Sequence, residues 1–176
     1  MKKKLKLILP NKKYALSYLK GEKEYQKEKM IVAAGGGTGL FTSLKDFHVY
    51  NKKMTGRRKG INLKKGRVPS TLYWAVVGDK VVGRLDLRQK SNKLLSKTGG
   101  YIGYAIVPSE RRKGYGTEML RLGLQKAKKF YKNKILITCA ENNIGSRKVI
   151  EKNGGIFINK MKNPENELML RFWIKI

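Results

Sequence analysis

The chain is poor in the residues that bind metals and form disulfide bridges. Its 176 residues include a single cysteine, Cys139, and a single histidine, His48. One cysteine cannot build a disulfide framework or a cysteine-rich zinc site. One histidine argues against a histidine-based metal site and against a Ser-His-Asp arrangement. The sequence therefore predicts a protein with no bound metal and no disulfide framework.

Long apolar runs are also missing. No stretch approaches the ~20 apolar residues that a membrane-spanning helix needs. The opening MKKKLKLILP has the basic start of a secretory signal, but its apolar run ends at Pro10 and is too short for a signal core. We expect a cytoplasmic protein with no membrane partner, either a monomer or a subunit of a homo-oligomer such as a homodimer.

Acidic residues are scarce. The chain has 12 Asp and Glu against 41 Lys and Arg, which gives a formal net charge of +29. A field of this sign favours anionic partners, such as nucleic acid, an acidic membrane surface or a polyphosphate ligand. The lysines are spread along the whole chain, however, so a coding bias toward lysine explains most of the charge about equally well. With 40% hydrophobic residues, the composition is that of a globular protein.

The pattern of apolar residues predicts a mixed α/β fold with a single domain over residues 1–176. Runs rich in β-branched and aromatic residues indicate strands, and runs at helical spacing indicate helices. The pair Gly78-Asp79 lies between two of the strands and predicts a hairpin. The expected strands are Leu5–Leu9, Thr71–Val77, Lys80–Arg88, Gly100–Val107, Lys134–Ala140, Gly155–Met161 and Glu167–Ile174; the expected helices are Asn11–Lys29, Thr42–Met54, Thr117–Phe130 and Asn143–Asn153; the expected exposed basic loop is Gly56–Gly66.

The segment VPSERRKGYGTEML, residues 107–120, predicts a phosphate site. A strand that leads through a tight turn into a helix presents the unpaired N–H groups and the positive end of that helix to a ligand. Gly114 and Gly116 let the backbone fold into an anion-binding nest, and Thr117 would cap the helix or contact the anion. Three consecutive cations raise the local potential: Arg111, Arg112 and Lys113. The alternative is a solvated basic turn with no ligand.

These residues resemble the GNAT superfamily of acyl-CoA-dependent N-acetyltransferases. RRKGYG is similar to the pyrophosphate loop of that superfamily, Q/R-x-x-G-x-G/A, and Pro108 stands at the usual distance before it. The segment CAENNIGSRKVIEKNGG, residues 139–155, resembles the second half of the cofactor site, in which an N-x-x-S/A element opens a helix. The resemblance implies an enzyme that uses acetyl-CoA as its co-substrate and binds no metal. It also implies a GNAT-like mixed central sheet of about seven strands flanked by helices.

The same resemblance implies which residues hold acetyl-CoA. The strand at Tyr104, Ala105 and Ile106 would splay from its neighbour and pair its free backbone groups with the pantetheine arm. Asn143 would contact the pantetheine side, and Ser146 completes the N-x-x-S element. Backbone amides of the loop would hold the pyrophosphate; the loop residues are Arg111, Arg112, Lys113, Gly114, Tyr115, Gly116 and Thr117.

Acetyl transfer by direct attack needs a neutral amine, a donor for the oxyanion and a proton for the departing thiolate. The backbone N–H of Ile106 is the expected oxyanion donor. The chain departs from the family in its acid–base groups: Ile150 stands where many relatives have a general-acid tyrosine, and Thr138 where some have a glutamate. Glu141 is the nearest acidic residue and is the candidate base, although a carboxylate there also suits a loop or helix cap.

Arg84, Asp86 and Arg88 alternate onto one face of an inner strand. They either line the cleft for the acceptor or belong to a solvated sheet face with internal ion pairs. We expect the acceptor to be a small-molecule or protein amine that is neutral, zwitterionic or carried on an anionic scaffold, because a polycationic aminoglycoside needs a carboxylate-lined pocket. Two other functions stay open: a catalytically weak acyl-CoA-binding regulator, and a basic nucleic-acid or ribosome-associated protein. The positive charge is compatible with a nucleic-acid partner, but the sequence contains no RNP-like RNA-binding motif.

The glycine-rich segment MIVAAGGGTGLF, residues 30–41, is a weaker candidate for a nucleotide loop. It lacks the G-K-S/T ending of a phosphate-binding Walker loop, and Leu40 stands where the dinucleotide pattern requires glycine. We interpret it as a flexible loop on the acceptor side, with a second phosphate site as the minority alternative.

Overall fold

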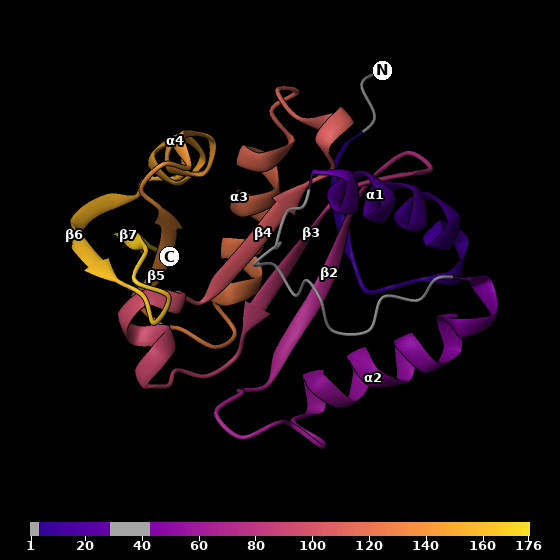
Figure 1. Cartoon of the computed structure of the whole chain (residues 1–176), viewed down its shortest axis with the longest axis horizontal. Helices are drawn as coiled ribbons and strands as arrows, with labels where there is room; N and C mark the ends of the chain where they lie inside the picture. The colour runs from indigo at the N-terminus through magenta and orange to yellow at the C-terminus, as the bar shows by residue number, and fades with distance from the viewer. Residues whose placement is uncertain (1–3, 29–42) are drawn as a thin grey trace.

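In the part of the chain that the structure describes, seven strands form two sheets, which separate between the strands Ile102–Ile106 and Lys134–Ala140 (Figure 1). The computed structural model describes residues 4–28 and 43–176, and every strand expected from the sequence is present. The strands are β1 (Lys6–Ile8), β2 (Ser70–Val77), β3 (Lys80–Arg88), β4 (Ile102–Ile106), β5 (Lys134–Ala140), β6 (Ile156–Lys162) and β7 (Leu168–Lys175). The helices are α1 (Ala15–Lys27), α2 (Phe47–Lys59), α3 (Tyr115–Ala127) and α4 (Ile144–Lys152), with short turns η1 (Lys12–Tyr14), η2 (Leu44–Asp46), η3 (Leu95–Gly99) and η4 (Pro108–Glu110).

The first sheet is antiparallel and has the order β1-β2-β3-β4. In it Arg84 of β3 lies opposite Trp74 of β2 and Ala105 of β4. Paired residues point to the same face of a sheet, so these three side chains share one face. The second sheet, β5-β7-β6, is also antiparallel. The expected hairpin at Gly78-Asp79 is therefore confirmed, as is the mixed α/β fold.

Two apolar clusters cover opposite faces of the first sheet. α1 and α2 pack on one face around Trp74, which is fully buried and stacks on Tyr18 with ring centroids 4.3 Å apart. α3 packs on the other face, where its Met119 and Leu120 meet Leu85 of β3. This second cluster continues into β5 and β7 and forms the larger core. Burial of these side chains is the main favourable term that holds the helices to the sheet.

The two sheets meet at one main-chain hydrogen bond among the described residues: the N–H of Tyr101, just before β4, donates to the carbonyl oxygen of Leu136 in β5 (2.8 Å). Beyond this bond β4 and β5 separate. Arg88 N donates to Tyr101 O, and Val107 N donates to Val82 O, so alternate residues of β4 pair with β3. The N–H and C=O groups of Tyr104 and Ile106 consequently point away from β3, into the gap.

The end of α2 differs from the sequence-based expectation. Gly56–Gly66 was predicted to be a loop because it is basic and contains glycine, but α2 continues through Gly56 to Lys59 and ends at Gly60, which has a left-handed conformation (φ 78°). The error has a physical reason: Arg57, Arg58 and Lys59 are favourable in the last turn of a helix, where they face the negative end of its dipole. The loop begins only at Gly60.

The glycine-rich segment 30–41 lies outside the described residues. None of the described helices is long and apolar enough to cross a membrane. The described ranges 4–28 and 43–176 also hold no cluster of three or more His, Cys, Asp or Glu side chains that could bind a metal ion.

Candidate active site

The turn between β4 and α3 presents a row of unpaired backbone N–H groups. For residues 112–117 no hydrogen bond from the main-chain N–H to any other described residue is found; the first bond in this stretch comes from Glu118 N, which donates to Gly114 O (3.3 Å). Arg112 and Gly114 both have positive φ angles, 61° and 80°, which curl the backbone so that successive N–H groups converge. The positive end of the α3 dipole adds positive potential at the same position. Chemically, this turn can bind an anion.

The two glycines of the turn serve different purposes. Gly114 is the N-cap of α3, and a Cβ atom placed on it would point into open space, so its left-handed backbone is what requires glycine. A Cβ on Gly116 would lie 3.1 Å from Val149 of α4 and 3.7 Å from Ile106 of β4, so Gly116 allows close packing. Thr117 lies in the third position of α3 and does not cap it, because the helix begins at Tyr115 and shows no side-chain cap.

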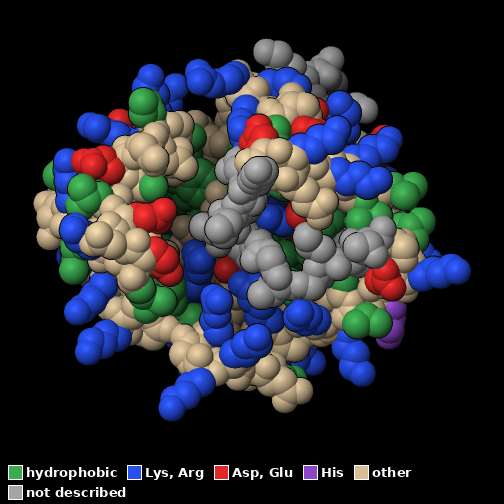
Figure 2. All heavy atoms as spheres, in the orientation of Figure 1, with side chains coloured by type: hydrophobic (Ala, Val, Ile, Leu, Met, Phe, Trp, Pro, Cys, Tyr) green, Lys and Arg blue, Asp and Glu red, His purple; other side chains and the backbone are tan. Residues whose placement is uncertain are grey.

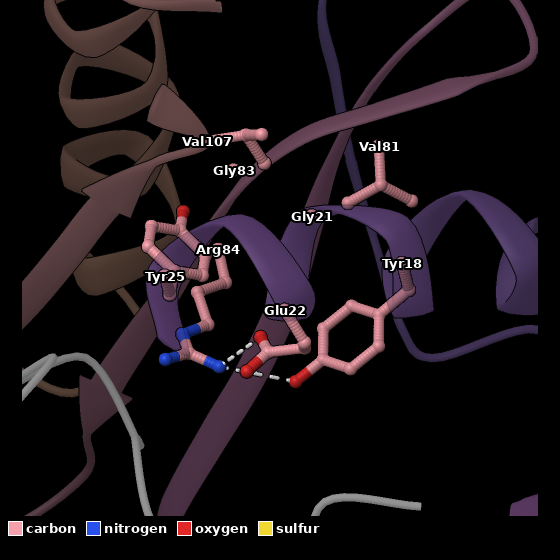
Figure 3. Close-up of a pocket in the computed structure, with 8 residues that line it drawn as sticks. All are labelled: Tyr18, Gly21, Glu22, Tyr25, Val81, Gly83, Arg84 and Val107. Atoms are coloured by element: carbon pink, nitrogen blue, oxygen red, sulfur yellow. Dashed lines mark hydrogen bonds and ion pairs between the residues drawn. The ribbon is translucent and has the colours of Figure 1, made fainter. Parts of the chain in front are cut away.

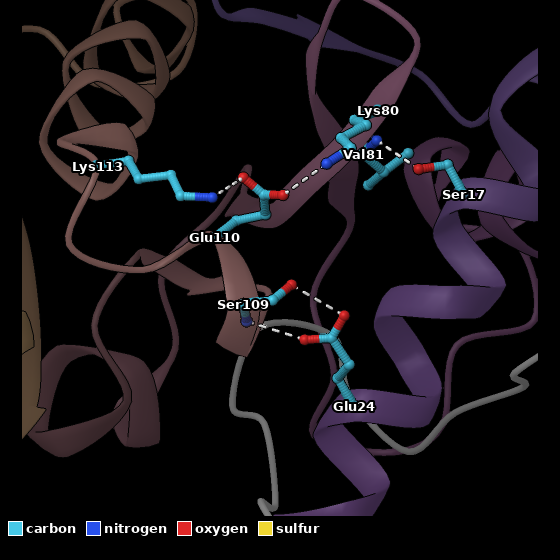
Figure 4. A network of polar contacts seen from close by, with 7 residues as sticks. All are labelled: Ser17, Glu24, Lys80, Val81, Ser109, Glu110 and Lys113. Carbon is cyan, nitrogen blue, oxygen red and sulfur yellow. Dashed lines mark hydrogen bonds and ion pairs between the residues drawn. The ribbon is translucent and has the colours of Figure 1, made fainter.

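The three cations of the turn differ in their partners, and Figure 4 shows the contact of Lys113 with Glu110. Arg111 forms a two-pronged ion pair with Glu28 at the end of α1 (3.2 and 2.8 Å), and its Nε donates to Ile106 O. Lys113 donates to Glu110, which also accepts from Lys80. Arg112 makes no ion pair with a described residue. The hydrogen bond from Lys113 holds the pKa of Glu110 below its ordinary value.

A polar cluster lies across the gap between β4 and α4. Asn143 caps α4: its Oδ1 accepts from the N–H of Ser146 (2.9 Å). The Tyr104 hydroxyl lies 2.9 Å from the Ser146 hydroxyl and donates to the Ser146 carbonyl oxygen (3.2 Å). Burial raises the pKa of Tyr104, so its hydroxyl keeps its proton at neutral pH. Burial likewise raises the pKa of the neighbouring Cys139 thiol to about 11. The sequence placed Tyr104 and Ser146 only among cofactor contacts; their side-chain pairing joins residues 42 positions apart.

Glu141, the candidate base, lies at the surface just after β5. Its carboxylate is paired with Lys160 of β6, and 42% of its side chain is exposed. Its N–H donates to Leu168 O, which extends the pairing with β7. This placement favours a surface ion pair over a role as catalytic base.

Arg84, Asp86 and Arg88 lie together on the face of β3 that α1 and α2 cover. Arg84 donates to Tyr18 and forms an ion pair with Glu22 of α1, and both charged side chains are almost fully buried (Figure 3). Asp86 accepts from Arg57 of α2 (2.6 Å) and lies 3.4 Å from Arg88. The ion pairs expected as one alternative are present, but they are buried and not solvated.

This strip also contains polar atoms without partners. Arg84 Nε, Asp86 Oδ1 and Arg88 Nη1 are buried and make no hydrogen bond. Desolvation of such groups is costly unless something satisfies them. Burial also lowers the pKa of Arg88, against the opposing effect of Asp86. Among the described residues, these three atoms are therefore unsatisfied polar groups buried on the face that α1 and α2 cover.

Known proteins share this architecture. A model of the acetyltransferase (GNAT) domain matches residues 42–156. RimL, a ribosomal L7/L12 alpha-N-protein acetyltransferase solved with coenzyme A, has a TM-score of 0.68 at 15% identity over 98% of this chain and 94% of its own. The microcin C7 self-immunity acetyltransferase MccE, solved with acetyl-CoA and AMP, has a TM-score of 0.70 at 14% identity over 98% and 92%. A ribosomal-protein-S5-alanine acetyltransferase from Vibrio fischeri has a TM-score of 0.68 at 14% identity over 97% and 92%.

At these identities the structural likenesses show the fold. No curated protein matches the sequence. The family match spans more than half of the chain and includes the β4–α3 turn, the gap and α4. The protein thus belongs to the GNAT acetyltransferase domain family and is an N-acetyltransferase that uses acetyl-CoA as its co-substrate.

Proposed function

We propose that acetyl-CoA binds in the gap between β4 and β5, with its pyrophosphate on the β4–α3 turn. The observation that carries this proposal is the run of N–H groups at residues 112–117 with no described partner, beside the edge of β4 at which the N–H groups of Tyr104 and Ile106 point away from β3. Figure 2 shows a hollow between the part of the molecule that contains α4 and the part that contains β4. The turn residues Arg111 to Thr117 would hold the diphosphate, and backbone groups of Tyr104 to Ile106 would pair with the pantetheine arm. Asn143 and Ser146 would border the same arm from α4.

The reaction in this site is direct attack of an amine on the thioester. A carbon–nitrogen bond forms and the carbon–sulfur bond breaks, while the proton that the amine loses balances the proton that the thiolate gains. The N–H of Ile106, or that of Tyr104 two residues before it, would donate to the oxyanion. The side chains of Tyr104 and Ser146 supply the donor for the leaving sulfur that the sequence left unassigned. Holding the two reactants in register supplies much of the remaining acceleration.

The acceptor would approach over the strip Arg84, Asp86 and Arg88. In this strip one carboxylate oxygen, Asp86 Oδ1, and two guanidinium nitrogens, Arg84 Nε and Arg88 Nη1, are buried without a described hydrogen-bond partner. Such a set suits an amine followed by a carbonyl group, as at the N-terminus of a polypeptide: the carboxylate would accept from the amine, and the guanidinium groups would donate to the carbonyl oxygens. We therefore propose a protein or peptide amine as the acceptor class, in keeping with the names of two of the similar structures.

A thiol-release assay with matched peptides tests this function. We expect turnover with a peptide that has a free N-terminus, none with the same peptide blocked at its N-terminus, and none with an aminoglycoside. Turnover of the aminoglycoside but not of the free peptide would contradict the acceptor proposal. Failure of acetyl-CoA to bind in a calorimetric titration would contradict the cofactor site.

A further inference from the structure

One surface of the molecule carries cations without carboxylates. It is formed by the end of α2, the loop 60–69 and the segment 90–97. Seven side chains on it are exposed, and none forms an ion pair with a described residue: Lys59, Lys64, Lys65, Arg67, Lys90, Lys93 and Lys97. We call this set the basic face. In Figure 2, Lys and Arg side chains gather along the lower edge of the view, over the end of α2 and the segment that follows it.

Hydrogen bonds hold the segments of the basic face together. Asn92 Nδ2 donates to Gly66 O (2.9 Å), which ties the segment 90–97 to the loop 60–69. Gln89 spans both parts, because its side chain donates to Arg58 O (3.1 Å) and its N–H donates to Pro69 O (2.8 Å). The cations therefore lie on one connected surface and are not scattered over the molecule.

A general excess of lysine does not account for this arrangement. Elsewhere several surface cations have acidic partners, as in Arg121–Glu118 and Arg147–Glu151. Between residues 47 and 109 the only acidic residues are Asp79 and Asp86. Asp86 is buried under the helices, and Asp79 lies in the β2–β3 turn, at the end of the hairpin opposite the basic face. The basic face thus lacks carboxylates that would neutralise it.

The chemistry of the face fits a polypeptide better than a nucleic acid. Ile61 and Leu94 are about half exposed among the cations, at 54% and 50%. Residues 59–69 and 90–97 contain no Phe, Tyr or Trp, so the face has no aromatic platform on which bases could stack. Mixed aliphatic and cationic side chains suit an acidic segment that also carries apolar residues.

We infer that the basic face docks an acidic segment of the protein acceptor. Gln89 directly follows Arg88, so the face adjoins the strip over which the amine would enter. A segment held there would raise the local concentration of its own amine at the strip. The identification of the bound protein as the acceptor rests on the proposed function, whereas the binding itself does not.

The binding is measured without acetyl-CoA, by fluorescence anisotropy with a labelled polyglutamate peptide. The test variant is Lys64→Glu, Lys65→Glu and Arg67→Glu combined; the control is Lys148→Glu, Lys152→Glu and Lys162→Glu, which changes the net charge equally on α4 and β6. We expect the test variant to bind the peptide at least about tenfold more weakly than the control does, and added salt to weaken binding by the unmodified protein. Thermal melting of both variants confirms that each is folded.

Three results would overturn the inference. The unmodified protein fails to bind polyglutamate at low salt; the control loses as much affinity as the test variant, which would assign binding to the overall charge; or an RNA duplex binds more tightly than the peptide and is lost in the test variant. Acetyl transfer to a short neutral peptide distinguishes the two proposals: if the test variant keeps this activity and loses polyglutamate, docking and catalysis are separate. If neither the unmodified protein nor the test variant shows acetyl transfer, while the unmodified protein still binds polyglutamate through the basic face, the proposed function fails and the inferred binding surface stands.

Discussion

The hydroxyl oxygens of Tyr104 and Ser146 lie 2.9 Å apart and link β4 to α4 across the gap between the two sheets. Both side chains border the space that the proposed site gives to the thioester. They come from different elements, so their distance depends on how α4 packs against the first sheet, and not on local sequence.

Removal of either hydroxyl is expected to slow acetyl transfer. For Tyr104→Phe and for Ser146→Ala we expect kcat to fall about tenfold to a hundredfold, because the leaving sulfur loses a hydrogen-bond donor. Affinity for coenzyme A should change little. Steady-state thiol release and calorimetry measure the two quantities, and Tyr14→Phe, at a hydroxyl far along the chain in η1, is the matched control. An unchanged kcat in both variants would exclude the pair from the chemistry.

Gly114 and Gly154 form a matched pair for testing the anion site. Both have φ of 80° and open space where a Cβ would stand, but Gly154 lies in the turn after α4. Alanine at either position should lower the stability by about 1–2 kcal/mol, because the backbone there is left-handed and a side chain disfavours that conformation. Only Gly114→Ala should also weaken coenzyme A binding, since only Gly114 lies in the turn that we propose to hold the diphosphate. Equal affinities of the two variants, measured by calorimetry, would contradict the assignment of the turn.

Glu110 should make stability depend on pH. Its pKa is lowered in the folded protein by the hydrogen bond from Lys113, so its contribution is present above the ordinary carboxyl value of 4.5 and is lost as pH falls through the lowered value. Glu110→Gln should therefore be less stable than the unmodified protein at pH 7, and the difference should shrink in strongly acidic solution. Denaturant titrations across this pH range measure it. A stability difference between the two proteins that grows toward low pH would contradict the lowered pKa of Glu110.

The buried pair Arg84–Glu22 should matter more to stability than any exposed pair. Glu22→Ala leaves a buried guanidinium without its carboxylate and is expected to cost about 3–5 kcal/mol. The exposed pair Arg121–Glu118 provides the comparison, and Glu118→Ala should cost under about 1 kcal/mol. Urea titrations measure both. Equal costs would mean that Arg84 finds another partner or reaches solvent.

The sequence predicts the elements better than their arrangement. Runs such as Lys134–Ala140 identify their strands because β-branched side chains suit a buried sheet, and Gly78-Asp79 identifies a hairpin because glycine tolerates the turn. The end of α2 is missed because charge and glycine content resemble those of a loop. The buried ion pairs of Arg84 and Asp86 have their partners on α1 and α2. The packing of these helices on the sheet cannot be read from the sequence near either residue.

The candidate site shows the same division. The glycines of the β4–α3 turn are local features that the sequence identifies, although α3 begins at Tyr115 and not at the expected Thr117. The partners of the cations are not local: Arg111 meets Glu28, which lies 83 positions earlier, and Ser109 meets Glu24, 85 positions earlier. Contacts of this separation are set by the packing of α1 beside η4, so side-chain roles there required the structure.

The hydrogen bond from Tyr101 to Leu136 joins the two sheets at one end of the gap between β4 and β5. Ala140 lies four residues beyond Leu136, about 13 Å farther along β5 at the usual strand rise. A change in the angle between the sheets at this bond would displace the far end of β5 by a distance proportional to that length. We therefore expect substitutions around Tyr101 and Leu136 to change the width of the gap near Ala140, and with it the size of acyl group that fits, without contacting that group.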